Sequence, residues 1–214
     1  MNDRKWEKFA ALGGVAFVVL NVAGTIAQGA PPSSDDTNDE VLKWFVDNES
    51  GIKVAAFLGA LSIIALLWWF GSLWRRMSRA ESGNHRLSIL ALGGLVGGGA
   101  LFAASTAVLA TVAIQVHEVP ADGAKFFYVL STAMLSMAGA FIATHLAAVN
   151  VLGMRTRFLP AWVSLLGLLA AAFFLVSALG VTTDADPVML FGLLGFVAWS
   201  IWILGVSAHM WRTP

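Results

Sequence analysis

The chain has 214 residues, of which 58% are hydrophobic and only 12% are charged, and it has no formal net charge and no cysteine. Soluble domains carry about 25% charged residues, so most of this surface is not built to face water. The zero net charge argues against nucleic-acid binding, the missing cysteine excludes disulfides and thiolate metal sites, and the length fits one domain, 1–214.

Six apolar segments follow one another along the chain, at 9–28, 53–74, 88–115, 125–152, 160–181 and 188–210. A helix needs about 20 apolar residues to span a bilayer, and each segment reaches that length. Their only charged residues are Lys53 and Lys125, at the first positions of the second and fourth segments. The sequence therefore predicts an all-α fold, a polytopic membrane bundle of six transmembrane helices.

Basic residues alternate between the parts of the chain that connect these spans. Ten of the 13 lysines and arginines lie in the two termini, the second loop and the fourth loop, namely Arg4, Lys5, Lys8, Arg75, Arg76, Arg79, Arg86, Arg155, Arg157 and Arg212. The other loops hold only Lys43, Lys53 and Lys125. Because basic loops stay on the cytoplasmic side, we expect both termini to be cytoplasmic.

The acidic residues divide the other way. Ten of the 13 carboxylates fall on the predicted outer side, namely Asp35, Asp36, Asp39, Glu40, Asp47, Glu49, Glu118, Asp122, Asp184 and Asp186. They form either a solvated rim or a negative field that concentrates cations.

The first loop, residues 29–51, is the one long polar stretch in the chain. Asn38 is a suitable helix cap, and Asp39 and Glu40 suit the first turn of a helix. An apolar cluster follows, made of Val41, Leu42, Trp44, Phe45 and Val46. We expect a short interfacial helix over 39–48, lying either on lipid or across the mouth of the bundle as a lid.

Small and polar residues share one side of three predicted helices when they are placed at 100° per residue. These faces are Ala10, Gly14, Asn21, Gly24, Thr25 and Gln28; Gly93, Gly97, Ala100, Ala104, Thr111 and Gln115; and Tyr128, Thr132, Ser136, Gly139, Ala143, Ala147 and Asn150. One interpretation is close helix packing, for which Gly93-x-x-x-Gly97 and Gly94-x-x-x-Gly98 are suited.

The other interpretation is an uncharged vestibule that opens outward. The polar members gather in the outer halves of their helices, and the inner half is apolar and aromatic, with Trp68, Trp69, Trp199 and Trp202. The candidate ligand-binding residues are Asn21, Thr25, Gln28, Thr111, Gln115, Tyr128, Thr132 and Ser136.

Intramembrane His145, with Asn150, is a further functional candidate, because ionisable groups are rare in membrane spans. His145 and His209 together suggest a haem site, but their predicted depths differ, and neutral His145 bonding between helices explains it as well. His117, Glu118 and Asp122 have no recognised zinc spacing. No hydrolase, phosphate-loop or dinucleotide motif is present, so we expect no catalytic residue, metal or cofactor.

Several stretches resemble a large group of actinobacterial six-span membrane proteins of unknown function. They are "WFVDNESGIKVAAFLGALSIIALLWWFGSLWRRM", "RLSILALGGLVGGG" and "RTRFLPAWVSLLGLLAA". The resemblance implies a multi-pass protein of a Gram-positive plasma membrane and supplies no catalytic residue.

Three functional hypotheses follow. The first is a non-enzymatic protein that binds a lipid or a small neutral ligand from the outer leaflet, or that serves as a membrane subunit of a homo-oligomer or larger assembly. The alternatives are a small transporter or channel entered through the vestibule, and a haem protein or intramembrane enzyme that uses His145. The expected partners are the bilayer and a bound lipid, and not nucleic acid.

The predicted threading is testable because the chain has no native cysteine. Cysteines introduced at Ser50 and Ser78 should label from opposite sides of intact cells with an impermeant maleimide, Ser50 from outside only. Labelling of both positions from the same side would contradict the topology.

Overall fold

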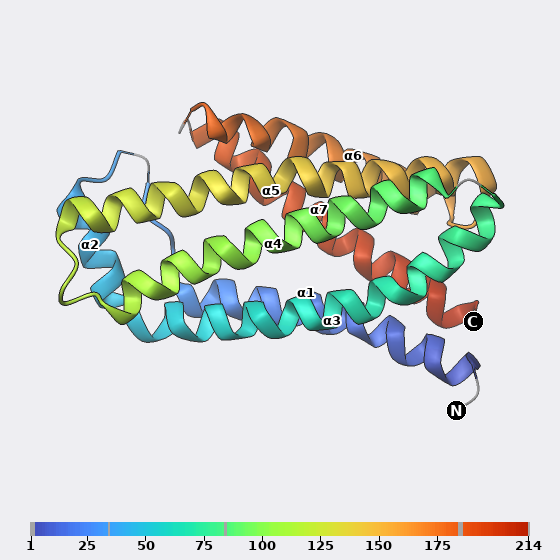
Figure 1. Cartoon of the computed structure of the whole chain (residues 1–214), viewed down its shortest axis with the longest axis horizontal. Helices are drawn as coiled ribbons and strands as arrows, with labels where there is room; N and C mark the ends of the chain where they lie inside the picture. Colours follow the sequence, from blue (N-terminus) through green and yellow to red (C-terminus); the bar gives the residue numbers. More distant parts are fainter. Residues whose placement is uncertain (1–2, 34, 84, 184–185, 214) are drawn as a thin grey trace.

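The computed structural model describes residues 3–33, 35–83, 85–183 and 186–213, without the side chains of 3–7 and 186–187. In this part the chain consists of helices and the loops that join them (Figure 1), with α1 Asp3–Gln28, α2 Asn38–Asp47, α3 Glu49–Glu81, α4 Arg86–Ile114, α5 Ala121–Thr156, α6 Ala161–Ser177, the short 3₁₀ helix η1 Ala178–Val181, and α7 Asp186–Arg212. Six of these helices are long and apolar enough to cross a membrane, so the predicted all-α membrane bundle is confirmed.

The helices extend beyond the apolar segments that predict them. α3 begins at Glu49 and continues through the arginine-rich stretch to Glu81, where Ser82 takes a left-handed conformation with φ of 38°. The Glu81 carboxylate then accepts hydrogen bonds from the backbone N–H groups of Leu87 and Ser88 at the start of α4. Hydropathy identifies only the membrane-spanning part of a helix. The helix itself continues until its backbone turns and the next helix is capped.

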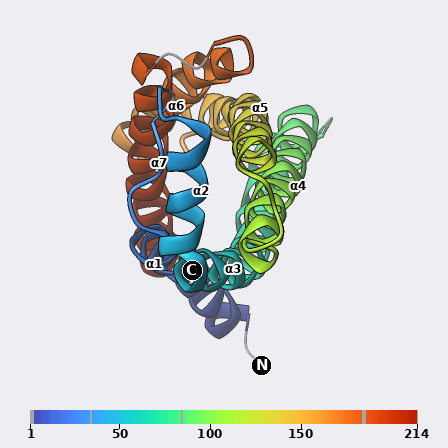
Figure 2. The same cartoon turned by 90° about the vertical axis from the view of Figure 1, so that its left-hand side faces the viewer.

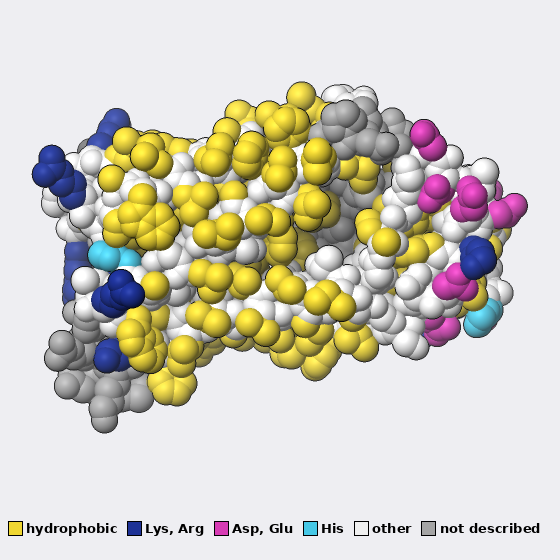
Figure 3. All heavy atoms as spheres, turned by 180° about the vertical axis from the view of Figure 1, so that it is seen from behind, with side chains coloured by type: hydrophobic (Ala, Val, Ile, Leu, Met, Phe, Trp, Pro, Cys, Tyr) yellow, Lys and Arg dark blue, Asp and Glu magenta, His cyan; other side chains and the backbone are white. Residues whose placement is uncertain are grey.

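The six long helices form a ring in which α1 packs on α3, α3 on α4, α4 on α5, α5 on α6, α6 on α7, and α7 closes back on α1 (Figure 2). Charges separate along the ring axis (Figure 3). We call the two ends the basic end, with Arg75, Arg76, Arg79, Arg86, Arg155, Arg157 and Arg212, and the acidic end, with Asp35, Asp36, Asp39, Glu40, Asp47, Glu49, Glu118 and Asp122. Arg4, Lys5, Asp184 and Asp186 lie outside the described side chains.

The main hydrophobic core fills the half of the bundle nearest the basic end. Trp69 of α3 and Trp202 of α7 are fully buried and meet edge to face with centroids 5.8 Å apart. The indole N–H of Trp69 donates to Ser207 Oγ at 2.9 Å. The indole N–H of Trp202 donates to Asn150 Oδ1 at 2.9 Å. These pairs join α3 to α7 and α7 to α5 by packing and hydrogen bonding at once.

A second, smaller cluster closes the acidic end. Val41 and Phe45 of α2 are buried against residues of three other helices and of the α4–α5 loop, namely Ile52, Val112, Ala113, Val116, Ala124 and Tyr128. Trp44 lies beside Phe45 and Tyr128, with ring centroids 4.8 and 5.9 Å away. Of the two placements expected for the short helix, the structure has the one across the mouth of the bundle.

α4 and α5 approach most closely at glycines. A Cβ on Gly94 would lie 2.5 Å from the carbonyl oxygen of Phe141 and 2.6 Å from the backbone nitrogen of His145. A Cβ on Gly93 would meet nothing within 4 Å, and Gly97 faces only the side chain of Phe141. Of the two overlapping glycine pairs in this helix, the pair that includes Gly94 therefore forms the close contact.

Substitution of these neighbouring glycines should give opposite results. Gly94→Ala pushes the backbones of α4 and α5 apart and should lower the free energy of unfolding by about 1–3 kcal/mol. Gly93→Ala, the matched control, adds a methyl group in open space and should be neutral or stabilising by up to about 1 kcal/mol, because alanine favours helix. Thermal unfolding in one detergent measures both. Equal midpoints for the two variants would contradict this account of the α4–α5 contact.

Candidate functional site

Between the main core and the acidic-end cluster lies a zone with no large buried apolar side chain among the described residues. The zone covers 18–28, 53–65, 96–111, 129–141, 175–181 and 188–197. Its buried residues are all glycine, alanine, serine or asparagine, namely Asn21, Gly24, Gly59, Ser62, Gly98, Ser105, Ser131, Ala138, Gly139, Ser177 and Gly195. Helices touch here through small side chains.

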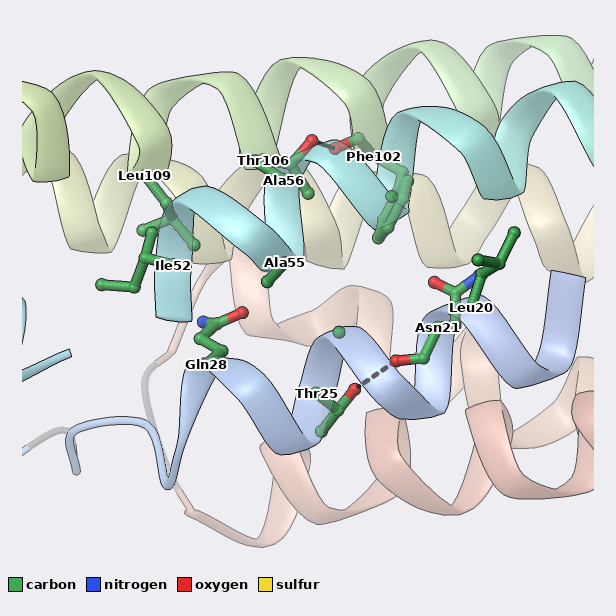
Figure 4. A pocket seen from close by; sticks show the side chains of 12 residues that line it. Leu20, Asn21, Thr25, Gln28, Ile52, Ala55, Ala56, Phe102, Thr106 and Leu109 are labelled. Atoms are coloured by element: carbon green, nitrogen blue, oxygen red, sulfur yellow. Dashed lines mark hydrogen bonds between the residues drawn. The ribbon is translucent and has the colours of Figure 1, made fainter. Parts of the chain in front are cut away.

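A pocket of about 80 Å³ opens in this zone among α1, α3 and α4 (Figure 4). It is lined by Leu20, Asn21, Gly24, Thr25, Gln28, Ile52, Ala55, Ala56, Gly59, Phe102, Thr106 and Leu109. The lining combines an apolar wall from α3 and α4 with a polar face from α1. A pocket of this size accommodates several water molecules or a small polar group.

The surface is also hollowed on the side of the bundle, between α1 and α7, toward the acidic end (Figure 3). The two helices touch nearer the basic end, where Gly14 faces Ser207 and the rings of Phe17 and Trp199 are 5.0 Å apart. Farther along, α1 and α7 diverge (Figure 1). We call this hollow the side opening.

Some polar groups in the pocket have hydrogen-bond partners among the described residues, and others have none. Thr25 Oγ1 donates to the backbone oxygen of Asn21 at 3.0 Å, and Asn21 Nδ2 donates to the backbone oxygen of Phe17 at 3.0 Å. Asn21 Oδ1 and the side-chain amide of Gln28 have no hydrogen bond to any described residue. Figure 4 shows both amides on the side of α1 that faces α3 and α4.

The structure thus brings together three of the residues that the sequence suggests for ligand binding, Asn21, Thr25 and Gln28. Thr111 and Gln115 are exposed at the end of α4, where Thr111 Oγ1 donates to the backbone oxygen of Ala107. They do not line the pocket.

The three candidates on α5 also lie away from the pocket. The Tyr128 hydroxyl donates to the backbone oxygen of Pro32 at 2.9 Å, under the loop that leads to α2. Thr132 Oγ1 donates to the backbone oxygen of Val129, and Ser136 lies beside Gly180 of η1.

Thr106 of α4 lines the pocket, although sequence analysis does not select it. Its hydroxyl donates within its own helix, to the backbone oxygens of Phe102 and Ala103. The adjacent polar pair Ser105-Thr106 inside an apolar run is the signal that marks this position.

His145 and Asn150 belong to the main core and not to the pocket. His145 Nδ1 lies 2.8 Å from the backbone oxygen of Ala91, so Nδ1 carries the proton and donates. The ring packs on Phe70 and Trp202, and Nε2 has no partner among the described residues. Asn150 Nδ2 donates to the backbone oxygen of Leu146, and its Oδ1 accepts from Trp202. Both side chains connect helices in a packed region.

The described residues contain no group of three histidine or acidic side chains that could hold a metal ion. The acidic end instead carries a capped helix. Thr37, and not Asn38, caps α2: its hydroxyl accepts from the Glu40 N–H, and its own N–H donates to the Glu40 carboxylate at 2.7 Å. Lys125 Nζ donates to the backbone oxygen of Asp36 at 2.7 Å and holds the same segment on α5.

Hydrogen bonds from the Thr37 backbone and hydroxyl lower the pKa of Glu40 below its ordinary value of 4.5. The ionised carboxylate therefore stabilises α2 above that pH, and the stabilisation is lost as the pH falls through the lowered value.

Comparison with known proteins identifies one relationship. A family model described as a domain of unknown function, DUF4386, matches residues 12–206. No curated protein and no solved structure matches the chain significantly.

The cap of α2 predicts a pH dependence confined to that helix. As the pH falls below 4.5, the amides of α2 should lose protection from hydrogen exchange, after correction for intrinsic rates, while those of α5 stay protected. Glu40→Gln should remove the pH dependence, and Asp39→Asn, a neighbour without the capping bonds, should keep it. Unchanged α2 protection at low pH in the native sequence would contradict this role for Glu40.

Proposed function

The chain belongs to the DUF4386 family, whose shared domain is of unknown function, and from this premise we propose that it is an integral membrane protein that binds a lipid-like amphiphile through its side opening. The proposed source of the ligand is the outer leaflet, because the basic residues assign the acidic end to the outside. The proposed location is a plasma membrane of the actinobacterial kind, with both termini cytoplasmic.

The observation that supports binding most directly is the contrast between the two halves of one bundle. The half near the basic end buries Trp69, Trp202 and other large side chains completely. The zone between this core and the acidic-end cluster buries only small residues and contains the pocket. Protein interiors are normally packed to the density of organic crystals, so an unfilled apolar zone suits a guest molecule. An acyl chain has the shape and polarity to fill it.

The position of α2 favours access from the membrane. Val41 and Phe45 of α2 are 1% and 0% exposed, and they cover the acidic end of the interior. A ligand that enters between α1 and α7 instead passes directly from lipid into the bundle. It needs no water-filled route, which suits a molecule of low solubility.

The same packing favours a binding protein over the other two hypotheses. Trp69 and Trp202 are both 0% exposed and close the basic half, so the described residues offer no polar path from end to end. His145 is fully buried against Phe70 and Trp202 and does not line the pocket among α1, α3 and α4. A channel or an enzyme would require this core to open.

The test uses vesicles of phosphatidylcholine that contain a diacylglycerol with a photoactivatable diazirine in one acyl chain. Ala56 lines the pocket, and Ala60, one turn farther along α3, is exposed and does not line it. Ala56→Phe should fill the pocket and reduce labelling of the α1 and α3 pocket peptides about tenfold, which corresponds to about 1.4 kcal/mol.

Ala60→Phe is the matched control and should label like the native protein. Thermal unfolding shows whether both variants remain folded, and Ala55→Phe provides a second way to fill the pocket. If the filled variants fold and label as strongly as the native protein, or if label spreads evenly over the lipid-facing surface, the proposal fails.

A further inference from the structure

Asn21 is an oriented acceptor at the inner wall of the pocket. Its side chain is only 9% exposed, and its Nδ2 must face the backbone oxygen of Phe17, to which it donates at 3.0 Å. Oδ1 is therefore turned away from that carbonyl, and no described residue donates to it. Because this oxygen is open to the pocket, water or a ligand donor can bond to it, and a ligand that displaces the water without supplying a donor leaves the oxygen unsatisfied.

The rest of the pocket defines what can supply that donor. Thr25 and Thr106 both use their hydroxyls within their own helices. Gln28, nearer the acidic end, has an amide that bonds to no described residue and that faces Ala55 across the pocket (Figure 4). With a volume of about 80 Å³, the pocket accepts a hydroxyl or an amine with its adjoining carbons, and not a bulky head group.

Electrostatics restricts the charge of that group. α1 ends at Gln28 without a basic residue in its last turn. The N-terminal turn of α3 packs against this end, with Gly51 beside the backbone oxygen of Ala27, so the two helix dipoles offset each other and the surrounding charged side chains set the sign of the field. The nearest lysine, Lys53, is paired with Glu49. Carboxylates outnumber lysines around the acidic end, where Asp36, Glu40 and Glu118 lie in the described chain. This field attracts a neutral or cationic donor and repels an anion.

From these contacts we infer that the amphiphile carries a hydrogen-bond donor without net negative charge, a hydroxyl or an amine, which donates to Asn21 Oδ1 while its apolar tail lies in the side opening. This inference rests on the proposed function and specifies the chemical class of its ligand. A lipid with one free hydroxyl, such as a diacylglycerol, is the simplest member of the class.

The test measures which lipids stay bound to the detergent-solubilised protein in native mass spectrometry. Four probes share two oleoyl chains: dioleoylglycerol, its acetate ester without a donor, its analogue with an amino group in place of the hydroxyl, and dioleoylphosphatidylglycerol, which has hydroxyl donors and a negative charge. The hydroxyl and amine probes should be retained about five- to tenfold better than the acetate and the anionic lipid. Their ratio to each other tells which donor the site prefers.

Variants separate the acceptor from general lipid binding. Asn21→Leu should reduce retention of dioleoylglycerol to that of its acetate and leave the acetate unchanged. Gln115→Leu, which changes an exposed amide outside the pocket, should alter neither. Because the Asn21 bond to Phe17 lies within one helix, Asn21→Leu should fold, and its thermal midpoint checks this.

The outcomes also distinguish the two proposals. If Ala56→Phe retains all four probes like the native protein, the pocket is not the binding site and both proposals fail. If Ala56→Phe loses the probes but Asn21→Leu keeps the preference for hydroxyl over acetate, only the inference about the donor fails. Stronger retention of the anionic lipid than of dioleoylglycerol would likewise overturn it.

Discussion

Hydrogen bonds and close contacts between helices at the basic end are the interactions on which the rest of this structure depends. Apolar surface gives little driving force for association in lipid, so membrane helices are held by close packing and by polar groups that find partners on other helices. Here two tryptophans do both: Trp69 bonds to Ser207, and Trp202 bonds to Asn150. His145 adds a bond to the backbone of α4. Four helices are thereby fixed within one half of the bundle.

Because that half is fixed, the other half can remain open without loss of the fold. Where α1 crosses α7, Gly14 allows close approach, and beyond Phe17 and Trp199 the two helices separate. On the opposite side of the ring, Gly94 and Gly98 allow α4 to approach the backbone of α5 closely. The opening therefore lies at one particular helix pair, and in the proposed function it faces lipid. A membrane protein built in this way would exchange a hydrophobic guest with the bilayer while its core stays packed.

The short helix α2 and the charges around it complete this arrangement. Val41 and Phe45 close the end of the interior, and Tyr128 and Lys125 hold the preceding loop on α5. The acidic groups stay in water, outside the pocket, whereas the polar groups inside it are uncharged amides and hydroxyls. Charge at a distance and an amide acceptor at close range would act together on a ligand head group: the first selects its sign, and the second selects its hydrogen bonding.

The sequence by itself determined the six spans, the separation of charge between the two ends and the existence of the helix near 39–48. Each of these depends on local composition, on apolar length, on the placement of charged residues and on a capping signal, none of which needs a partner helix. It also indicated the polar face of α1, where Asn21, Thr25 and Gln28 do share a pocket.

Only the tertiary structure decided which face of α4 turns inward. α4 is apolar all round, so hydropathy does not distinguish Gly94 from Gly93 or tell that Thr111 faces outward. Likewise, the fit of α5 against its neighbours decided that Tyr128 holds a loop and that His145 lies in the core. Lipid accommodates every face of such an apolar helix equally well. The shape of the neighbouring helices therefore decides which face turns inward.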